Sequence, residues 1–266
     1  MYRSVALVFA GLITLSADCV AQNPPLTRQN NPAFVSHPER ERPARELRRE
    51  RTALDLPGAI QQIAGQSISL VRLRVPQKAR GFFEKGRKAF GKHQYSEAQK
   101  KLNQALQACP AFPEALTMAG YIQMSLNQWG AAEQSLQTAV RTDPSYGLAR
   151  IVLADLYNAE KRFGDALAAA QQAVASIPHS WVLEFEMARA HLGEHQYELA
   201  VSVSDDSLRK NRGTLLHVVK AHALIALHRY PEAVTELRTY LQYQPQGDLS
   251  QDAHQLLDQI QSATTQ

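Results

Sequence analysis

The chain contains the stretch WGAAEQSLQTAVRTDPSYGLARIVLADLYNAEKRFGDA from Trp129 to Ala166, which begins and ends with the same spacing of an aromatic residue and an alanine. This aromatic–alanine pair recurs along the chain as Tyr95–Ala98, Trp129–Ala132, Phe163–Ala166, Tyr197–Ala200 and Tyr230–Ala233. Successive pairs are 34 residues apart, except for the last step of 33 residues. Prolines follow the same period at Pro110, Pro144 and Pro178. A constant period of this length indicates a repeat architecture.

The residue types in each repeat predict two antiparallel helices. One column holds only small residues, at Gly86, Gly120, Ala154, Ala188 and Ala221. A small side chain there, together with the alanine of the aromatic–alanine pair, lets two helices approach more closely than the usual 8–10 Å. Proline stops the second helix, because its ring clashes with the preceding turn and it has no N–H to donate. The aromatic residue fills the turn between the helices.

This pattern resembles the tetratricopeptide repeat family, in both its period and its order of small, large and proline positions. The resemblance covers residues 79–247, which we divide into repeats 79–112, 113–146, 147–180, 181–213 and 214–247. It implies an all-α fold, a right-handed α-solenoid of about five helix hairpins. Residues 248–266 are predicted to add a C-terminal capping helix, with Leu256, Leu257 and Ile260 on its apolar face.

The first 21 residues have the composition of a secretory signal peptide. Arg3 precedes an apolar run from Val5 to Ala17, and Cys19-Val20-Ala21 is a candidate cleavage site. We therefore expect an exported protein, periplasmic or secreted. Two alternatives remain open, an uncleaved anchor and a lipoprotein; Asp18 disfavours lipid attachment at Cys19, because a small residue is expected before a lipidated cysteine.

Two further segments precede the repeats. Residues 22–56 are rich in Gln, Asn, Pro and Arg, and we expect this tail to be disordered because it has little apolar surface to bury. Within it, residues 37–51 carry both arginines and glutamates, which indicates either a solvated linker or weak contact with an anionic membrane surface. Residues 57–78 form a short joint, in which periodicity allows a helical turn or a strand ending at Pro76.

Composition excludes several classes of protein. The chain has 266 residues, a net charge of +4 and a pI of about 9.1, which is far from the charge of a typical nucleic-acid-binding domain, so no nucleic acid partner is expected. Its 2 cysteines exclude a disulfide scaffold and any multi-cysteine metal site. Once a signal peptide is removed, Cys109 remains as a lone cysteine, which we expect to be a small buried residue.

No catalytic or metal-binding constellation emerges from the sequence. His191, Glu194 and His195 spell an inverted zinc-protease motif, but Gly193 ends the helix between the two histidines, so they would not share one helical face. There is no glycine-rich phosphate loop and no nucleophile elbow. We therefore predict a non-enzymatic protein that needs neither a metal nor another cofactor.

Binding of a protein partner is the remaining prediction. In the family that the repeats resemble, the first helices line a concave groove that holds a peptide or protein segment. The family register places these residues in the groove: Phe83, Arg87, Phe90, Tyr121, Met124, Ile151, Asp155, Asn158, Phe185 and Arg189. An alternative remains open, in which some of these residues pack internally or against residues 57–76. The carboxylate clamp of some members, which uses lysine and asparagine, is absent here.

The sequence thus predicts a scaffold or adaptor in the cell envelope. An alternative is a structural or self-assembly element of an envelope complex, which light scattering at several concentrations would distinguish. The framework of such repeats determines the shape of the groove but does not name the partner or the oligomeric state.

Overall fold

The computed structural model describes residues 74–178, 180–210, 213–247 and 249–264, and in these ranges the chain is helical without any strand. Five hairpins follow one another: α4 (Gln77–Gly91) with α5 (Tyr95–Ala108), α6 (Pro113–Ser125) with α7 (Trp129–Thr142), α8 (Gly147–Ala159) with α9 (Phe163–Val174), α10 (Trp181–Gly193) with α11 (Tyr197–Leu208), and α12 (Leu215–Ala226) with α13 (Tyr230–Tyr243). A last helix, α14 (Ser250–Thr264), packs against α13. The predicted all-α solenoid is confirmed.

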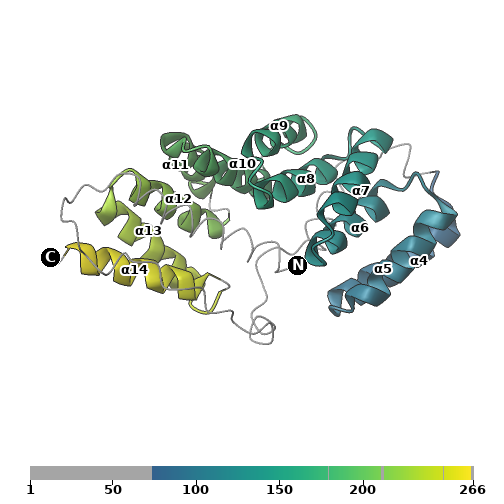
Figure 1. The fold of residues 1–266 in the computed structure, drawn as a ribbon, viewed down its shortest axis with the longest axis horizontal. Helices are drawn as coiled ribbons and strands as arrows, with labels where there is room; N and C mark the ends of the chain where they lie inside the picture. Colours follow the sequence, from purple (N-terminus) through teal and green to yellow (C-terminus); the bar gives the residue numbers. More distant parts are fainter. Residues whose placement is uncertain (1–73, 179, 211–212, 248, 265–266) are drawn as a thin grey trace.

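The hairpins stack side by side into an arch (Figure 1). From the second hairpin to the fifth, the first helices of consecutive hairpins touch, because α8 contacts both α6 and α10, and α10 contacts α12. Each second helix packs against its own partner and against the first helix of the next hairpin, as α9 does with α8 and α10. The first helices therefore form an inner layer and the second helices an outer layer.

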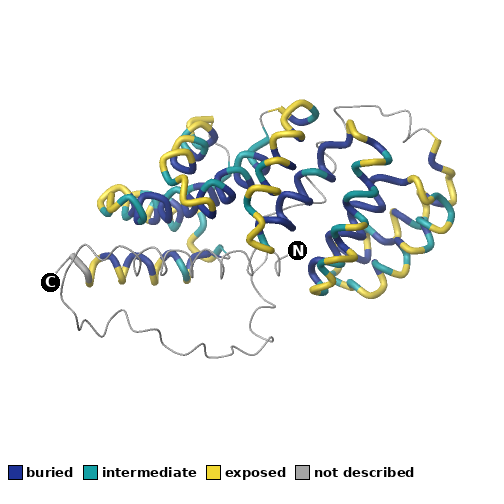
Figure 2. Tube along the Cα trace, turned by 45° about the horizontal axis from the view of Figure 1, so that its top comes forward, coloured by how far each residue is buried: buried dark blue, intermediate teal, exposed yellow. Residues whose placement is uncertain are grey.

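The two layers differ in how far their helices are buried (Figure 2). In α9 the buried residues are Ala166, Ala169, Ala170 and Ala173, a single stripe at helical spacing. In α8 every residue from Ile151 to Asn158 is buried. An amphipathic helix has one covered face, whereas a helix that is apolar all round requires cover on every side.

Close approach of the two helices in a hairpin explains the column of small residues. A Cβ atom added to Gly120 would lie 2.6 Å from Cγ of Leu136 and 3.2 Å from the carbonyl oxygen of Ala132. At Gly86 the corresponding distance to Cγ of Leu102 is 3.2 Å. Leucine in the second helix thus occupies the space that glycine leaves in the first helix.

A left-handed residue joins the two helices of each hairpin. These residues are His93, Asn127, Lys161, His195 and His228, with φ values of 59–62°. Around Lys161, its own N–H donates to the carbonyl of Asn158 at 3.1 Å, and the N–H of Arg162 donates to the carbonyl of Tyr157 at 2.8 Å. This is the Schellman pattern that ends many helices, where glycine is the usual residue.

Lys161→Gly is expected to stabilise the protein by about 0.5–1 kcal/mol, because glycine adopts positive φ without the steric strain of a side chain. The measurement is urea unfolding followed by circular dichroism. Glu160→Gly is the matched control, since Glu160 has a φ of −84° and glycine gains nothing there. A loss of stability in both variants would contradict this explanation of the turn.

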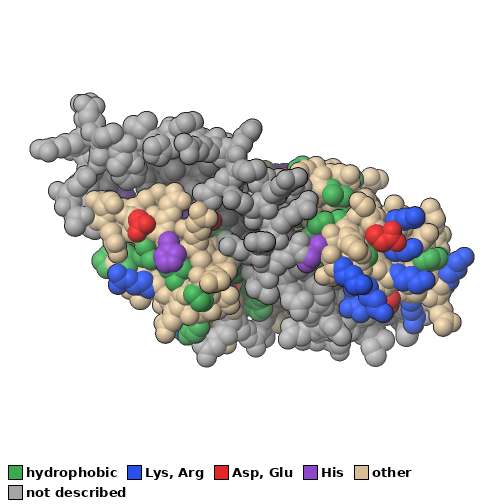
Figure 3. Space-filling model, turned by 90° about the horizontal axis from the view of Figure 1, so that it is seen from below, with side chains coloured by type: hydrophobic (Ala, Val, Ile, Leu, Met, Phe, Trp, Pro, Cys, Tyr) green, Lys and Arg blue, Asp and Glu red, His purple; other side chains and the backbone are tan. Residues whose placement is uncertain are grey.

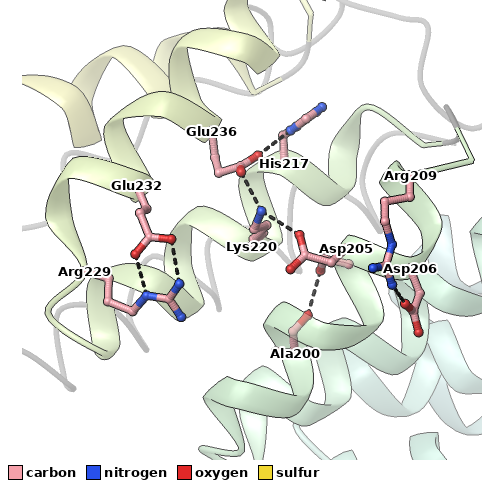
Figure 4. A network of polar contacts seen from close by, with 10 residues as sticks. Ala200, Asp205, Asp206, Arg209, His217, Lys220, Arg229, Glu232 and Glu236 are labelled. Atoms are coloured by element: carbon pink, nitrogen blue, oxygen red, sulfur yellow. Dashed lines mark hydrogen bonds and ion pairs between the residues drawn. The ribbon is translucent and has the colours of Figure 1, made fainter.

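An ion-pair cluster connects the fourth and fifth hairpins (Figure 4). Lys220 on α12 reaches Asp205 on α11 and Glu236 on α13, both at 2.6 Å. The second carboxylate oxygen of Glu236 accepts a hydrogen bond from Nδ1 of His217 at 2.6 Å. These partners hold the pKa of Glu236 below its ordinary value, although burial opposes that effect. The cluster lies where three helices meet and joins the fourth hairpin to the fifth through polar contacts.

Several features predicted from the sequence lie outside the described residues. These are the signal peptide, the tail of residues 22–56, its segment 37–51, and the joint as far as residue 73. Val75 is buried, and Pro76 precedes the first turn of α4. Among the described helices, none combines the length and apolar character needed to cross a membrane.

Positive side chains gather at the end of the arch that α4 and α5 form (Figure 3). Exposed lysines there include Lys78, Lys85, Lys88, Lys92 and Lys100. Cys109 follows α5 and is half-buried with a free thiol, so it is less enclosed than the sequence predicted.

Candidate functional site

The residues predicted for the groove lie on the inner helices, and all of them except Arg87 are buried. Phe185 and Met124 are 0% exposed, and even the charged Arg189 is only 2% exposed. The inner layer therefore presents no row of open side chains. Its most informative part is a polar cluster between α8 and α10.

Arg189 is the centre of this cluster, which we call the inner-face cluster: Asp155, Asn158, Glu186 and Arg189. Its Nη1 atom donates to Oδ1 of Asp155 at 3.0 Å and to Oε2 of Glu186 at 2.7 Å. Nδ2 of Asn158 donates to the same Oε2 of Glu186 at 2.9 Å and to its main-chain carbonyl at 3.0 Å. The guanidinium also lies 5.4 Å from the centroid of the Phe185 ring. Two neighbouring repeats are thus joined through buried charges.

The charges of the inner-face cluster do not balance if both acids are ionised. Arg189 can neutralise one carboxylate, and a second buried negative charge would be expensive. Burial raises the pKa of Glu186 to about 8, with the negative charge of Asp155 adding to the increase and Arg189 opposing it. At neutral pH Glu186 therefore holds a proton, and the cluster as a whole carries no net charge.

Some polar atoms of this region have no hydrogen-bond partner in the described part of the chain. They are Nε and Nη2 of Arg189, Oδ1 of Asn158, and both ring nitrogens of His222. His222 is 2% exposed, and burial lowers its pKa to about 4, so its ring is neutral at physiological pH. Buried polar groups are normally paired, and an unmade bond costs about 1–3 kcal/mol. These atoms are therefore buried without the hydrogen bonds that such groups normally make within the described part of the chain.

The first hairpin uses its predicted site residues differently. Phe83 packs against Phe112, with ring centroids 5.0 Å apart. Phe90 packs edge-on against Tyr121 at 5.8 Å. Arg87 donates from Nε and Nη2 to one carboxylate oxygen of Glu84, at 3.0 and 2.8 Å, on its own helix. These residues do not join the inner-face cluster, and Met124 and Ile151 belong to the apolar core.

Comparison with known proteins agrees with this architecture. Residues 117–180 match the tetratricopeptide repeat family. This stretch of the chain therefore carries the tetratricopeptide repeat pattern. A search of curated protein sequences gave no match.

Solved tetratricopeptide repeat structures share the fold at low sequence identity. TTC0263 of Thermus thermophilus, a thermophilic protein of this class, is 20% identical with a TM-score of 0.58, over 68% of this chain and 98% of that one. MamA of Desulfovibrio magneticus RS-1 is 15% identical with a TM-score of 0.56, over 65% and 99%. PilW, a widely conserved type IV pilus biogenesis factor, is 16% identical with a TM-score of 0.60, over 63% and 78%.

Sequence reasoning missed two residues of this site in the tetratricopeptide array. Glu186 was not selected, although an acid three positions before Arg189 on the same helix is a signal of pairing. His222 continues the spacing of Asp155 and Arg189 by one further repeat, but it was not selected as a site residue. Spacing alone did not reveal that both side chains are fully buried.

The zinc-protease motif spans a turn between tetratricopeptide helices. Nδ1 of His191 bonds Oε1 of Gln196 at 2.7 Å, whereas Nδ1 of His195 bonds the hydroxyl of Tyr197 at 2.7 Å. His195 is the left-handed residue of that turn. Within the described ranges, no three His, Cys, Asp or Glu side chains form a group that could hold a metal ion.

Proposed function

We propose that this protein is a non-catalytic scaffold that holds a segment of a partner protein against the inner layer of its repeats. The observation that carries the proposal is the inner-face cluster, where two buried nitrogens of Arg189, Nε and Nη2, have no hydrogen-bond partner among the described residues. Main-chain carbonyl oxygens of an extended segment are acceptors suited to these donors. Unpaired buried donors exclude an apolar ligand, because it would leave their hydrogen bonds unmade.

The composition of the inner layer also favours a polypeptide. The inner-face cluster combines an arginine with an aromatic ring, because the guanidinium of Arg189 lies 5.4 Å from the centroid of the Phe185 ring. Aromatic residues and arginine are the side chains that most often dominate the energy of protein interfaces. We further propose that the protein acts in the cell envelope, on the basis of the signal-like sequence of residues 1–21 and the likeness to the pilus factor PilW.

The test compares capture of partner proteins by chains that differ only in the inner-face cluster. The apolar variant Asp155→Leu/Glu186→Met/Arg189→Met replaces the buried charges together, a change that often leaves stability equal or higher. After crosslinking in intact cells, we expect this variant to lose at least nine-tenths of the protein that co-purifies with the wild type.

The matched control replaces a second charged cluster in the same manner. The variant Asp205→Leu/Lys220→Met/Glu236→Leu changes the junction of α11, α12 and α13 and leaves the inner-face cluster intact. It should capture the same proteins as the wild type. Equal capture by the apolar variant and the wild type, with both folded by circular dichroism, would overturn the proposed binding site.

A further inference from the structure

The first hairpin differs in charge from the hairpins that follow it. Residues 74–108 carry nine Lys or Arg and two Asp or Glu, so their formal net charge is +7. Residues 109–266 carry 11 Lys or Arg and 17 Asp or Glu, so their formal net charge is −6. Because α4 and α5 form one end of the arch, positive charge is concentrated at that end (Figure 1, Figure 3).

Four lysines of this hairpin form a single line, which we call the lysine stripe: Lys78, Lys85, Lys88 and Lys92. The first three lie on α4, Lys92 is its C-cap, and all four are exposed. At about 100° per residue they fall within about 80° of the helix circumference, and they span about 21 Å of its length. Gly81 lies in the same stripe, and a Cβ atom added there would meet no other atom within 4 Å. The stripe is therefore an open surface without a bulky side chain between its lysines.

The acids of the first hairpin are engaged with other residues. Glu84 pairs with Arg87 at 2.8 Å, and Glu97 pairs with Lys101 at 3.2 Å. These two are the only acids between residues 74 and 108. Like charges three and four positions apart on a helix repel each other. An anionic surface that approached the lysine stripe would relieve this repulsion.

The chemistry of the lysine stripe favours phospholipid headgroups over a protein or a nucleic acid. Protein interfaces usually have apolar or aromatic residues at their centre. Among the described residues, the large apolar side chains that are exposed are Val174, Leu199 and Tyr243, and all three lie in later hairpins. Contacts to nucleic acid rely on arginine forks and stacked aromatic rings, neither of which the stripe contains. Lysine is a compact point charge, which suits attraction to a surface of many phosphates.

We propose that the lysine stripe docks the protein on an anionic phospholipid surface. Each lysine near such a surface contributes about a fivefold increase in affinity. The later hairpins carry net negative charge, so the same surface repels them. The protein is therefore bound by one end of its arch, with the later hairpins directed away from the surface.

This docking does not depend on the proposed scaffold function. The lysine stripe belongs to the first hairpin, whereas the inner-face cluster lies on α8 and α10, and no residue is shared. The docking also differs from the weak contact predicted from the sequence for residues 37–51, which lie outside the described residues. Vesicle binding and partner capture are measured separately, so failure of one is distinguishable from failure of the other.

The first experiment measures sedimentation of the full chain with vesicles of phosphatidylglycerol mixed with phosphatidylcholine. The stripe variant changes all four lysines of the stripe to glutamine. The matched control also removes four exposed positive charges, but from later hairpins: Lys161→Gln/Arg209→Gln/Lys210→Gln/Arg238→Gln. Both variants have the same net charge, so a difference between them reports the position of the charges.

We expect the stripe variant to bind these vesicles at least a hundredfold more weakly than the wild type, because four lysine contributions are lost together. The matched control should bind within about threefold of the wild type. Added salt should weaken binding of the wild type, since salt screens exposed charges. On vesicles of phosphatidylcholine alone, the wild type and the stripe variant should bind equally.

The second experiment locates the surface of contact on the bound protein. Cys19 and Cys109 are replaced by serine, and Gly81→Cys carries a fluorophore within the lysine stripe. Gly130→Cys is the control probe on α7, where an added Cβ atom also meets no other atom within 4 Å. When the vesicles contain lipids with a quencher on the headgroup, the fluorophore at position 81 should lose at least half of its emission. The fluorophore at position 130 should keep its emission.

Four results would overturn the proposal. Equal binding of the stripe variant and the wild type to the anionic vesicles would show that the lysine stripe makes no contact. Equal losses in the stripe variant and the matched control would show that net charge alone matters. Quenching at both probes or at neither would place the contact elsewhere on the chain. Tighter binding of the wild type to a DNA duplex or to polyglutamate than to the vesicles would assign the stripe to a nucleic acid or to an acidic protein.

Discussion

Arg189→Met is expected to lower the free energy of unfolding by about 3–5 kcal/mol, the range for breaking a buried ion pair on one side. The substitution leaves Asp155 and Glu186 buried without their cation, and both lose the hydrogen bond from Nη1. For a domain of this size, the melting temperature should fall by something on the order of 10 °C. Thermal and urea unfolding, followed by circular dichroism, measure both quantities.

Two controls separate two effects on the free energy of unfolding. One is the effect of leaving a buried carboxylate without its cation, and the other is the effect of removing an arginine from any position. Arg162→Met removes a guanidinium that pairs with Glu133, Glu160 and Asp165, but the Arg162 side chain is 42% exposed. Solvent screening limits its expected effect to less than about 1 kcal/mol. The apolar variant of the inner-face cluster should recover most of the stability that Arg189→Met loses. Equal losses from Arg162→Met and Arg189→Met would contradict the role of burial.

Stability is expected to fall as the pH rises from 6.5 to 8. Because the pKa of Glu186 is raised to about 8, the folded protein keeps a proton there that the unfolded chain releases above its ordinary pKa of 4.5. The folded state binds more protons in that interval, so the unfolding free energy declines with pH. One unit of pKa difference corresponds to about 1.4 kcal/mol, which gives a decline of roughly 2 kcal/mol over this window.

His222 has the opposite effect at lower pH. Burial lowers its pKa to about 4 from 6.5, so the unfolded chain binds a proton there that the folded protein excludes. The contribution of His222 to the free energy of unfolding is fully present above pH 6.5 and is lost as the pH falls toward 4. Between about pH 4.5 and 6.5, Glu186 and His222 change the free energy of unfolding with pH in opposite directions, and the two changes cancel. The net decline in the free energy of unfolding therefore begins only above that range.

The measurement is urea unfolding at a series of pH values for the wild type and Glu186→Gln. Glutamine cannot titrate, so the variant should show no decline between pH 6.5 and 8 and should rise in stability from pH 4.5 to 6.5. Glu194→Gln is the matched control, because it changes an exposed glutamate just after the same helix. If the wild type and Glu186→Gln have parallel profiles, Glu186 is ionised in the folded protein.

The repeat pattern was sufficient to predict the hairpins because its signals are local. The column of small residues at Gly120 and its equivalents reflects contact between two helices that are neighbours in sequence. The aromatic residue that opens each second helix, such as Phe163, marks the same turn in each repeat. By contrast, the left-handed residue is histidine in three of the described hairpins, asparagine in one and lysine in one, so the side-chain type alone does not reveal that shared feature.

The candidate site was predicted less completely. The register placed Asp155, Asn158 and Arg189 on the inner layer, and the structure brings these three together. It also adds Glu186, which turns a pair into a cluster with an excess acid. The same register placed Arg87 in the groove, where it pairs only with Glu84 on its own helix in the described contacts.

The sequence alone determined that the chain forms stacked helix pairs, because a period of 34 residues repeats the same local contacts in every unit. The resemblance to a known family implied which helix of each pair faces inward. Tertiary structure alone decided that the inner side chains are buried, that Glu186 keeps its proton and that Nε and Nη2 of Arg189 have no hydrogen-bond partner in the described part of the chain. Burial and pKa depend on every atom within a few ångströms, and here those atoms come from positions about 30 residues apart in the sequence.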